Sequence, residues 1–366
     1  MDPRNDGIAG RNQPKIPAAV LGATGAVGQR FIQLLEAHPW FDVAAVAASD
    51  RSAGKTYAQA CSWKLDTPIP ADAARLDVRS LDPAKLGRDD IRLVFSALPA
   101  DIARDIEPLF AEAGMAVSSN AAAFRYAPDV PVILPDVNPE HLQLVNAQRL
   151  NRQWNGLLIT NPNCTTSGIA LVLKPLQEAF GLQRVFVSTL QAISGAGYPG
   201  IPSLDILGNV VPWIGGEEEK IEREARLLLG SIEDGEQKAA EFKTSAHANR
   251  VPVVDGHTIC LSVGFDHHGV SPEDVSRVLT SFRGGGPASE LPSAPKPPLR
   301  VLTAADRPQP RLDCSAQAGM QVSVGRIRPC DILDIRLVLV VHNTVRGAAG
   351  GSILNAELLV HDGWLR

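Results

Sequence analysis

The chain has 366 residues, of which 45% are hydrophobic and 20% are charged, and its formal net charge at pH 7 is −5. A chain of this length and hydrophobic content can bury the cores of two domains. The mildly acidic balance argues against a nucleic-acid-binding surface, so any basic site has to be a local pocket.

The cysteines are widely spaced and form neither a CxxC pair nor a Cys/His cluster at metal-ligand spacing. This pattern predicts free thiols in a reducing compartment, and we expect a cytoplasmic protein without a bound metal. The cysteines are Cys61, Cys164, Cys260, Cys314 and Cys330.

The N-terminal sequence is polar and resembles neither a signal peptide nor a membrane anchor. We expect residues 1–15 to be a disordered tail. No apolar run in the chain approaches the roughly 20 residues that a helix needs to cross a bilayer. The sequence therefore predicts no association with a membrane.

Short apolar runs from residue 16 onward are separated by segments in which apolar residues follow helical spacing. In the first such unit, the strand is followed by the turn GATGAVGQR and the helical segment FIQLLEA. Strands and helices that alternate in this way predict a parallel, doubly wound sheet of the Rossmann type. The predicted strands lie at 16–21, 43–48 and 91–99, near 118, and from 156 toward the cysteine at 164.

The first turn carries a GxxGxxG pattern between a strand and a helix, which is typical of dinucleotide-binding sites. Glycine allows the backbone to approach a pyrophosphate, and the helix N-terminus offers N–H groups to it. The alternative is a glycine turn that serves packing only. The residues of this turn that we expect to bind a cofactor are Gly22, Thr24, Gly25, Ala26, Val27 and Gly28.

The end of the second predicted strand indicates which dinucleotide is bound. Enzymes that use NAD usually carry Asp or Glu there, whereas this chain has Ser49, followed by Asp50, Arg51 and Ser52. Arg51 and the two serines can bind a 2′-phosphate, which favours NADP, although Asp50 would repel the phosphate if it pointed inward. The alternative is that Arg51 and Lys55 are solvated loop charges.

The pattern changes after residue 184, where the apolar runs become longer. VFVSTLQAIS, HTICLSVGF and DILDIRLVLVV predict the strands of a mixed sheet in an α+β domain. Residues 284–298 are rich in Pro and Gly and predict a surface loop. The sequence from His342 onward predicts a polar turn and then a long amphipathic helix.

The sequence NPNCTTSG places Cys164 between a strand and a helix that we expect to end at Gly181. The helix dipole is expected to lower the pKa of this thiol and to favour a reactive thiolate. The backbone N–H of Cys164 and the amide of Asn163 can stabilise an oxyanion. The alternative is a buried structural cysteine, which is the interpretation that we adopt for the other four.

A thiol nucleophile needs a base, and His257 is the best candidate because it lies between a glycine and an apolar strand. Adjacency to Cys164 in space cannot be derived from sequence. The competing candidates are His247, His267, His268 and His342.

Eight blocks, in order along the chain, match a known family. The chain resembles the aspartate-semialdehyde dehydrogenases, in the branch found in archaea and fungi, from about Pro17 to about Leu359. The blocks are GATGAVGQRF, ASDRSAGKTY, SNAAAFRYAPDVP, NPNCTTSG, QAISGAGYPG, GGEEEK, NRVPVVDGHT and HNTVRGAAGGS.

The resemblance implies a role for individual residues. Cys164 would form a thioacyl intermediate, and His257 would be its acid/base partner. The implied substrate ligands are Arg250 for the α-carboxylate, Glu217 for the ammonium group, Gln191 for orientation, and Arg125, Lys220 and Asn163 for the phosphate. The implied cofactor contacts are Ser194, Gly195 and Gly197 beneath the nicotinamide and Asn343 from the C-terminal segment.

The family function would be NADPH-dependent conversion of L-aspartyl-4-phosphate and release of phosphate, giving L-aspartate 4-semialdehyde for lysine, threonine and methionine biosynthesis. The resemblance implies an NADP-binding Rossmann domain of residues 16–160 and 343–366. Residues 161–342 would form the catalytic and dimerisation domain of a homodimer or homotetramer. From the residues alone, we would interpret the run from Glu217 to Lys220 as an ordinary charged helical face and Arg125 as a surface charge.

Three other functions remain open. Acyl-CoA reductases such as malonyl-CoA reductase share the scaffold, but their substrate has no ammonium group for Glu217. N-acetylglutamyl-phosphate reductases are disfavoured for the same reason, because their amine is acylated. A non-catalytic NADP-binding module would have no need for Cys164 together with His257.

Overall fold

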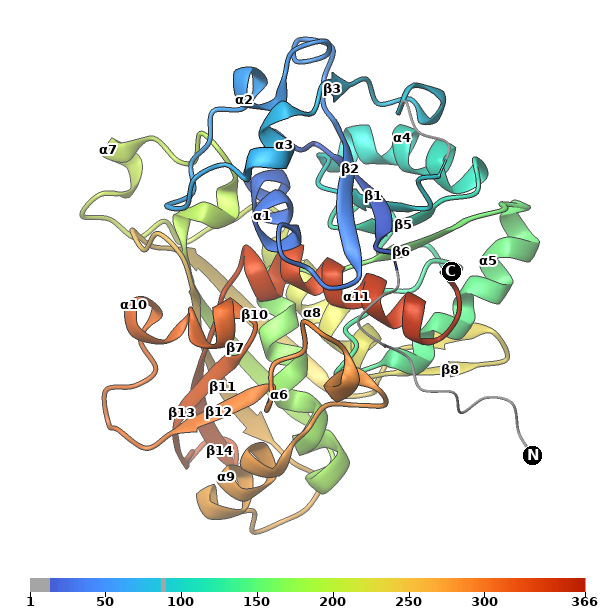
Figure 1. The fold of residues 1–366 in the computed structure, drawn as a ribbon. Coiled ribbons are helices and arrows are strands. Elements are labelled where there is room, and N and C mark those ends of the chain that lie inside the picture. Colours follow the sequence, from blue (N-terminus) through green and yellow to red (C-terminus); the bar gives the residue numbers. More distant parts are fainter. Residues whose placement is uncertain (1–13, 87–89, 366) are drawn as a thin grey trace.

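The structure is a computed structural model that describes residues 14–86 and 90–365. It contains two six-stranded sheets, one above the other in Figure 1, with a helix between them. The predicted disordered tail lies, except for residues 14 and 15, outside the described residues.

The first sheet is entirely parallel, with the strand order β3-β2-β1-β4-β5-β6. This order confirms the predicted Rossmann-type sheet. The chain reverses its direction of winding between β1 and β4, which is where doubly wound sheets bind ligands. The strands are β1 Ile16–Leu21, β2 Phe41–Ala47, β3 Val78–Arg79, β4 Leu93–Ser96, β5 Ala116–Ser119 and β6 Leu157–Thr160.

Helices cover both faces of this sheet, which explains why its central strands are apolar on both sides. The helices of this part of the chain are α1 Ala26–Leu35, α2 Tyr57–Ala60, α3 Ala71–Arg75, α4 Ala100–Glu112 and α5 Leu144–Arg152. The last helix of the chain, α11 Gly350–His361, also packs against this sheet through β4 and β5.

The prediction of an amphipathic C-terminal helix was wrong. Every residue of α11 from Gly350 to Leu359 is buried, including Glu357. The helix runs between the two halves of the molecule (Figure 1), so its sides face protein instead of water. It is preceded by a π-helical turn, Val345–Ala349.

The second sheet is mixed, as predicted, with the order β10-β7-β11-β14-β13-β12. The β10–β7 and β12–β13 pairs are parallel and the other three are antiparallel. The strands are β7 Arg184–Gln191, β10 Lys243–Arg250, β11 His257–Gly264, β12 Leu299–Leu302, β13 Val322–Pro329 and β14 Ile335–Val341. A small hairpin is formed by β8 Ser231–Glu233 and β9 Glu236–Lys238.

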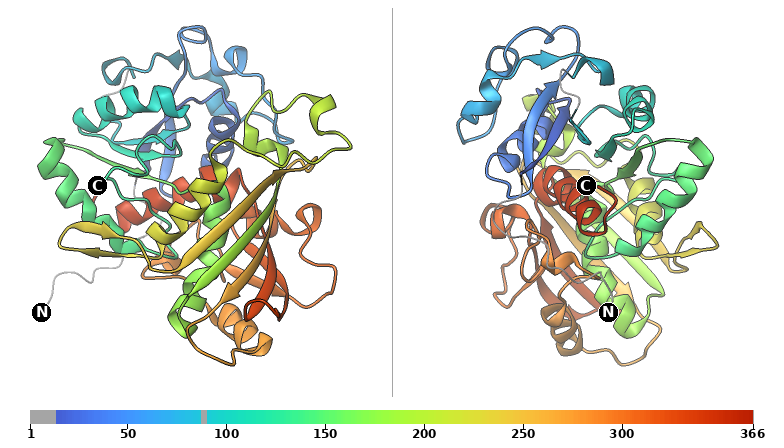
Figure 2. Two further views of the ribbon diagram at one scale, coloured as in Figure 1. Left: turned by 180° about the vertical axis from the view of Figure 1, so that it is seen from behind. Right: turned by 45° about the vertical axis from the view of Figure 1, so that its right-hand side comes forward.

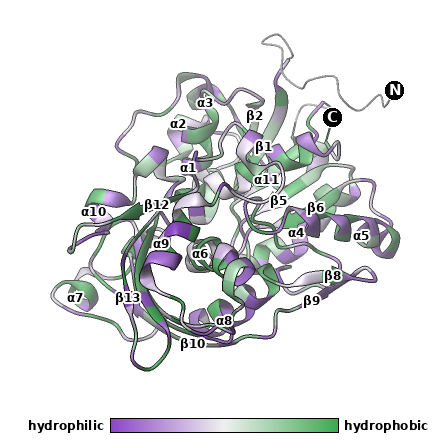
Figure 3. Ribbon diagram, turned by 90° about the horizontal axis from the view of Figure 1, so that it is seen from below, coloured by the Kyte–Doolittle hydropathy of each residue, from purple (hydrophilic) through white to green (hydrophobic). Residues whose placement is uncertain are grey.

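Three helices lie on one face of the second sheet, which curves around them (Figure 3). They are α6 Cys164–Phe180, α8 Glu217–Leu228 and α9 Pro272–Ser281. Along β7 buried and accessible residues alternate, because its other face is not covered by helices (Figure 2, left). Two short helices lie at the margins, α7 Ser203–Ile206 and α10 Pro310–Asp313.

Helix α6 begins and ends where the sequence predicted. The side chain of Asn163 accepts hydrogen bonds from the backbone N–H groups of Thr165 and Thr166, and Gly181 ends the helix with φ +67°. The helix is buried almost all round because it lies between the second sheet and the first half of the chain.

The segment 284–298, predicted as a surface loop, is only partly exposed. Leu291 and Ala294 are buried in the same core as α11. The backbone N–H of Ser293 donates to both carboxylate oxygens of Glu357, at 3.1 and 3.0 Å. The loop therefore packs onto the core of the first sheet and onto α11. Its Pro and Gly content predicts a loop but does not show whether distant segments bury it.

Candidate active site

A cavity of about 780 Å³ extends from the reversal point of the first sheet to the N-terminus of α6. Most residues predicted for the site line it, although they come from distant parts of the sequence. They are Gly22, Thr24, Gly25, Ala26, Val27, Ser49, Arg125, Asn163, Cys164, Gln191, Ser194, Gly195, Gly197, Glu217, Lys220, Arg250 and Asn343.

Four predicted residues do not line the cavity. Gly28 is buried in the first turn of α1, where a Cβ atom would lie 2.2 Å from the carbonyl oxygen of Gly22. Arg51 and Ser52 belong to an exposed turn after Ser49, whose carbonyl accepts the Ser52 N–H at 2.8 Å. His257 is fully buried behind the cavity wall.

The cofactor end of the cavity is shaped by backbone. Gly22 has φ +71°, and a Cβ there would lie 2.7 Å from the carbonyl oxygen of Ala97. Gly25 precedes α1, and no described side chain caps the N–H groups of its first turn. These N–H groups belong to residues that line the cavity, so the turn has the form that binds a pyrophosphate.

The sulfur of Cys164 lies 3.2 Å from Nε2 of His257. The other ring nitrogen, Nδ1, accepts the backbone N–H of Ala192 at 3.0 Å. The neutral imidazole therefore carries its proton on Nε2 and presents it to the sulfur. A protonated ring would also place an N–H at Nδ1, against the N–H of Ala192.

The electrostatics of the pair correct the expectation of a resting thiolate. Burial raises the pKa of Cys164 to about 12, and the charge of Glu217 adds to this rise, whereas Arg125 and Arg250 oppose it. Burial, aided by Arg250 and His342, lowers the pKa of His257 to about 3. Burial therefore favours the neutral form of both groups at pH 7, because desolvation outweighs the helix dipole.

The loop after β7 and the segment before β11 hold Cys164 and His257 in place, and both are fixed by side-chain hydrogen bonds. The guanidinium of Arg250 donates from Nη1 to the carbonyl oxygen of Ala192 at 2.7 Å. Asn343 donates to Oγ of Ser194 at 2.8 Å and accepts the N–H of Gly256, which precedes His257, at 3.0 Å. A Cβ at Gly195 would lie 2.8 Å from Nη1 of Arg250.

Glu217 is the acidic centre of the cavity. Its Oε1 accepts hydrogen bonds from Asn163 at 2.9 Å, Gln191 at 3.0 Å and Thr165 at 3.3 Å. Its Oε2 lies 3.9 Å from Nζ of Lys220. The amide of Asn163 thus caps α6 and orients Glu217, so its expected contact with an oxyanion or phosphate competes with these bonds.

Arg125 reaches the cavity from the loop after β5. It donates from Nη2 to the carbonyl oxygen of Asn120 at 2.9 Å and from Nη1 to Glu224 at 3.2 Å. Glu224 was not predicted. It lies two helical turns after Glu217 on the face of α8 that also buries Ile221, so an acid on an apolar face was the available signal.

Arg346 and Gly347, also not predicted as site residues, lie in the π-helical turn beside the nucleophile. Arg346 is completely buried and pairs with Asp136, which is also buried. A Cβ at Gly347 would lie 2.7 Å from Cβ of Cys164. The turn therefore forms a wall against Cys164, and the buried ion pair holds it there.

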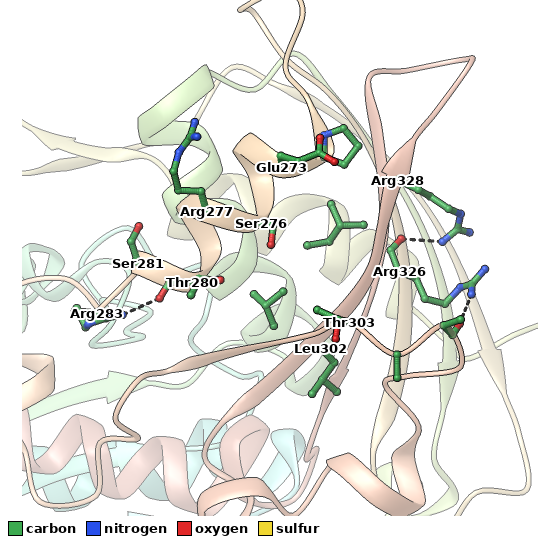
Figure 4. A pocket seen from close by; sticks show the side chains of 15 residues that line it. Glu273, Ser276, Arg277, Thr280, Ser281, Arg283, Leu302, Thr303, Arg326 and Arg328 are labelled. Carbon is green, nitrogen blue, oxygen red and sulfur yellow. Dashed lines mark hydrogen bonds between the residues drawn. The ribbon is translucent and has the colours of Figure 1, made fainter.

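A second cavity, of about 830 Å³, lies between α9 and strands β12 and β13 (Figure 4). Arg326 and Arg328 extend across β13, away from Ser276, and donate to the carbonyl oxygens of Ala305 and Arg326. Arg283 donates to two carbonyl oxygens of its own loop. These arginines do not converge on the cavity, which is therefore not a candidate site.

Residues 14–86 and 90–365 contain no cluster of three or more His, Cys, Asp or Glu that could hold a metal ion. The cysteines are all free. Within the described chain, none of the helices combines the length and the apolar character required to cross a membrane.

The fold and the site define a class: a two-domain dehydrogenase with a dinucleotide-type sheet and a cysteine at the cleft. Residues 17–145 match the family described as semialdehyde dehydrogenase, NAD binding domain, and residues 173–346 match its dimerisation domain. The chain belongs to the aspartate-semialdehyde dehydrogenase family.

The relatives cover nearly the whole chain. The aspartate-semialdehyde dehydrogenase of Methanothermobacter thermautotrophicus is 50% identical over 94% of this chain and 99% of its own. That of Schizosaccharomyces pombe is 48% identical over 94% of this chain and 98% of its own. A crystal structure of the Candida albicans enzyme with NADP has a TM-score of 0.88 and 44% identity, covering 96% of this chain and 100% of that one.

Proposed function

We propose that the protein reduces L-aspartyl-4-phosphate to L-aspartate 4-semialdehyde, with NADPH as reductant and release of phosphate. The observation that carries this proposal is the 3.2 Å contact between Cys164 and His257 at a cavity that also exposes an acid and three cations. Arg250 suits the substrate carboxylate and Glu217 its ammonium group. Arg125 and Lys220 suit the phosphate.

The turn from Gly22 to Val27 would hold the pyrophosphate of NADP, with Ser49 at the adenosine end. Arg51 and Ser52 would reach the 2′-phosphate from the neighbouring turn. Ser194, Gly195, Gly197 and Asn343 would lie at the nicotinamide end. When bound, NADPH supplies the hydride that reduces the thioester.

In the first half of the reaction, the sulfur of Cys164 attacks the acyl carbon and gives up its proton. The bond between that carbon and the phosphate oxygen breaks, the phosphate leaves with the proton, and a thioester forms. The backbone N–H of Cys164, at the start of α6, stabilises the oxyanion. In the second half, the reduced carbon loses the sulfur as the aldehyde forms. His257 contributes its Nε2 proton as a hydrogen bond to the sulfur, which stabilises the thiolate that leaves.

The competing acyl-CoA reductase is disfavoured because Glu217 is buried, bonded to Gln191 and directed into the cavity, where a substrate without an ammonium group would offer its charge no counter-charge. A comparison of the rates with aspartate semialdehyde plus phosphate and with malonate semialdehyde plus CoA distinguishes the two. A non-catalytic module predicts no turnover with either pair.

The decisive variant is Cys164→Ala. It should abolish turnover and leave the affinity for NADP, measured by fluorescence titration, within about twofold, because the thiol lies at the far end of the cavity from the pyrophosphate turn. Full activity in this variant would refute the proposed function.

We also propose that the protein is a homodimer, alone or as half of a homotetramer, formed through the uncovered face of the second sheet. Phe186 and Leu190 are exposed on this face. Apolar side chains of the nearby segment around α7 are exposed as well, namely Tyr198, Leu204, Leu207 and Trp213. Light scattering should show a dimer or tetramer that Leu190→Glu weakens; an unaffected mass would contradict this interface.

The domain division belongs to the same proposal. The first sheet ends with β6 at Thr160, and α11 returns to it, which supports a cofactor domain of residues 16–160 and 343–366 and a catalytic domain of residues 161–342. A location in the cytoplasm is supported by the free thiols.

A further inference from the structure

Glu224 is a buried carboxylate that contacts both halves of the candidate site. It is 0% exposed, and its Oε1 accepts hydrogen bonds from Arg125 and from the hydroxyl of Tyr126, both at 3.2 Å. Its Oε2 accepts the backbone N–H of Asn163, the residue before Cys164. One carboxylate thus joins the cation that lines the cavity to the turn that carries the nucleophile.

These contacts cannot be replaced by neighbouring groups. The N–H of Asn163 lies before the first turn of α6, so the helix offers it no carbonyl partner. Arg125 is 7% exposed, and Glu224 is the acid that pairs with it. Loss of the carboxylate would leave the buried N–H of Asn163 without an acceptor, and it would leave the buried guanidinium of Arg125 with the carbonyl oxygen of Asn120 but without its counter-charge.

We propose that Glu224 is a positioning residue that sets the place of Arg125 relative to Cys164 and thereby controls the step in which phosphate reacts. This inference rests on the proposed function, because it assigns the phosphate to Arg125. Glu224 touches neither sulfur nor substrate; it acts through Arg125 on one side and Asn163 on the other.

Two effects of Glu224 on phosphate have opposite signs. Its negative charge alone would repel a phosphate dianion, so its neutralisation would improve the use of phosphate. Its bridging geometry holds Arg125 at the cavity wall, so its disruption would impair that use. Gln replaces one of the two carboxylate oxygens by an NH2 group, so it can accept on the side of Arg125 or on the side of Asn163 but not on both.

The test is Glu224→Gln, with Glu219→Gln as the matched control on the exposed side of the same helix. In the oxidative direction, kcat/KM for phosphate should fall by roughly tenfold or more in the first variant, as expected for lost hydrogen bonds to charged groups, and stay unchanged in the control. The Kd for NADP should change by less than about twofold, because the pyrophosphate turn lies elsewhere.

If Glu224→Gln does not fold, Tyr126→Phe supplies the answer, because Tyr126 is partly exposed and its hydroxyl is one of the donors to Glu224. A decrease in kcat/KM for phosphate of about threefold is expected there. If the wild-type protein is active, a kcat/KM for phosphate that increases in these variants, or that equals the value of Glu219→Gln, would overturn the positioning role alone. A wild-type protein without activity toward aldehyde and phosphate would instead refute the proposed function and this inference with it.

Discussion

Removal of the Glu217 carboxylate should make Cys164 more reactive while it abolishes efficient turnover. Glu217 is buried and bonds to Asn163 and Thr165, the two residues that flank the nucleophile. After burial, its charge is the largest cause of the raised pKa of Cys164. An ammonium group bound to Glu217 would cancel this charge, so the substrate itself would favour the thiolate.

The size of the effect follows from Coulomb's law. At an effective dielectric constant of about 20, two unit charges about 4 Å apart interact by about 4 kcal/mol. The Glu217 carboxylate bonds to the residues on either side of Cys164 instead of to the sulfur, so its effect on the free energy of the thiolate is roughly half of this, about 2 kcal/mol. Glu217→Gln should therefore lower the pKa of Cys164 by between about one and two units. Since the thiolate is the reactive form, alkylation at pH 7 should be about tenfold faster.

The assay is alkylation by iodoacetamide between pH 6 and pH 9, with the peptide that contains Cys164 quantified by mass spectrometry. In the wild-type protein the rate should rise with pH throughout, without a plateau, because the pKa of about 12 lies above this range. Glu219→Gln should match the wild type. Alkylation of Cys164 in Glu217→Gln that is slower than, or equal to, the wild type would refute this reasoning.

Three further predictions concern the surroundings of the nucleophile. Asp136→Asn should lower the free energy of unfolding in urea by about 3 kcal/mol, because it leaves the completely buried Arg346 without its counter-charge. A change no larger than that in the exposed control Asp105→Asn would contradict it. Gly347→Ala should reduce kcat by at least about tenfold with little effect on NADP affinity, since its Cβ would overlap Cys164. An unchanged kcat would show that the backbone of the turn can move away from Cys164 without loss of catalysis. Between pH 5 and 8, the pH profile of kcat/KM should show no change caused by the titration of His257, because a pKa lowered to about 3 keeps the imidazole neutral throughout. A decrease of kcat/KM below about pH 6.5 that is absent in His257→Gln would be incompatible with this prediction.

Local patterns predicted most of the secondary structure. The strand Ile16–Leu21, the glycine turn and the limits of α6 at Asn163 and Gly181 follow from runs of apolar residues, glycine and capping chemistry, which act over a few residues. Errors arose where burial depends on distant segments. Helix α11 is buried on all sides because the two halves of the chain enclose it, and no periodicity within its own sequence shows this.

Most residues of the candidate site were predicted from the resemblance to the family. The residues alone predicted the dinucleotide-binding turn and Cys164. Cys164 was identifiable from its position between a strand and a helix, whereas His257 had four competitors until the fold placed it 3.2 Å from the sulfur. The sequence does not single out Glu224, because a charged residue in a charged helix has no distinctive signal until its buried partners are known.

The sequence by itself determined the elements, the dinucleotide-binding turn and the residue types available for catalysis, because these depend on backbone preferences and on neighbours along the chain. Only the tertiary structure decided the protonation states of Cys164 and His257, the bridge through Glu224 and the burial of Arg346. These properties depend on desolvation and on distances between groups far apart in sequence, and both arise only when the two sheets are packed around α6 and α11.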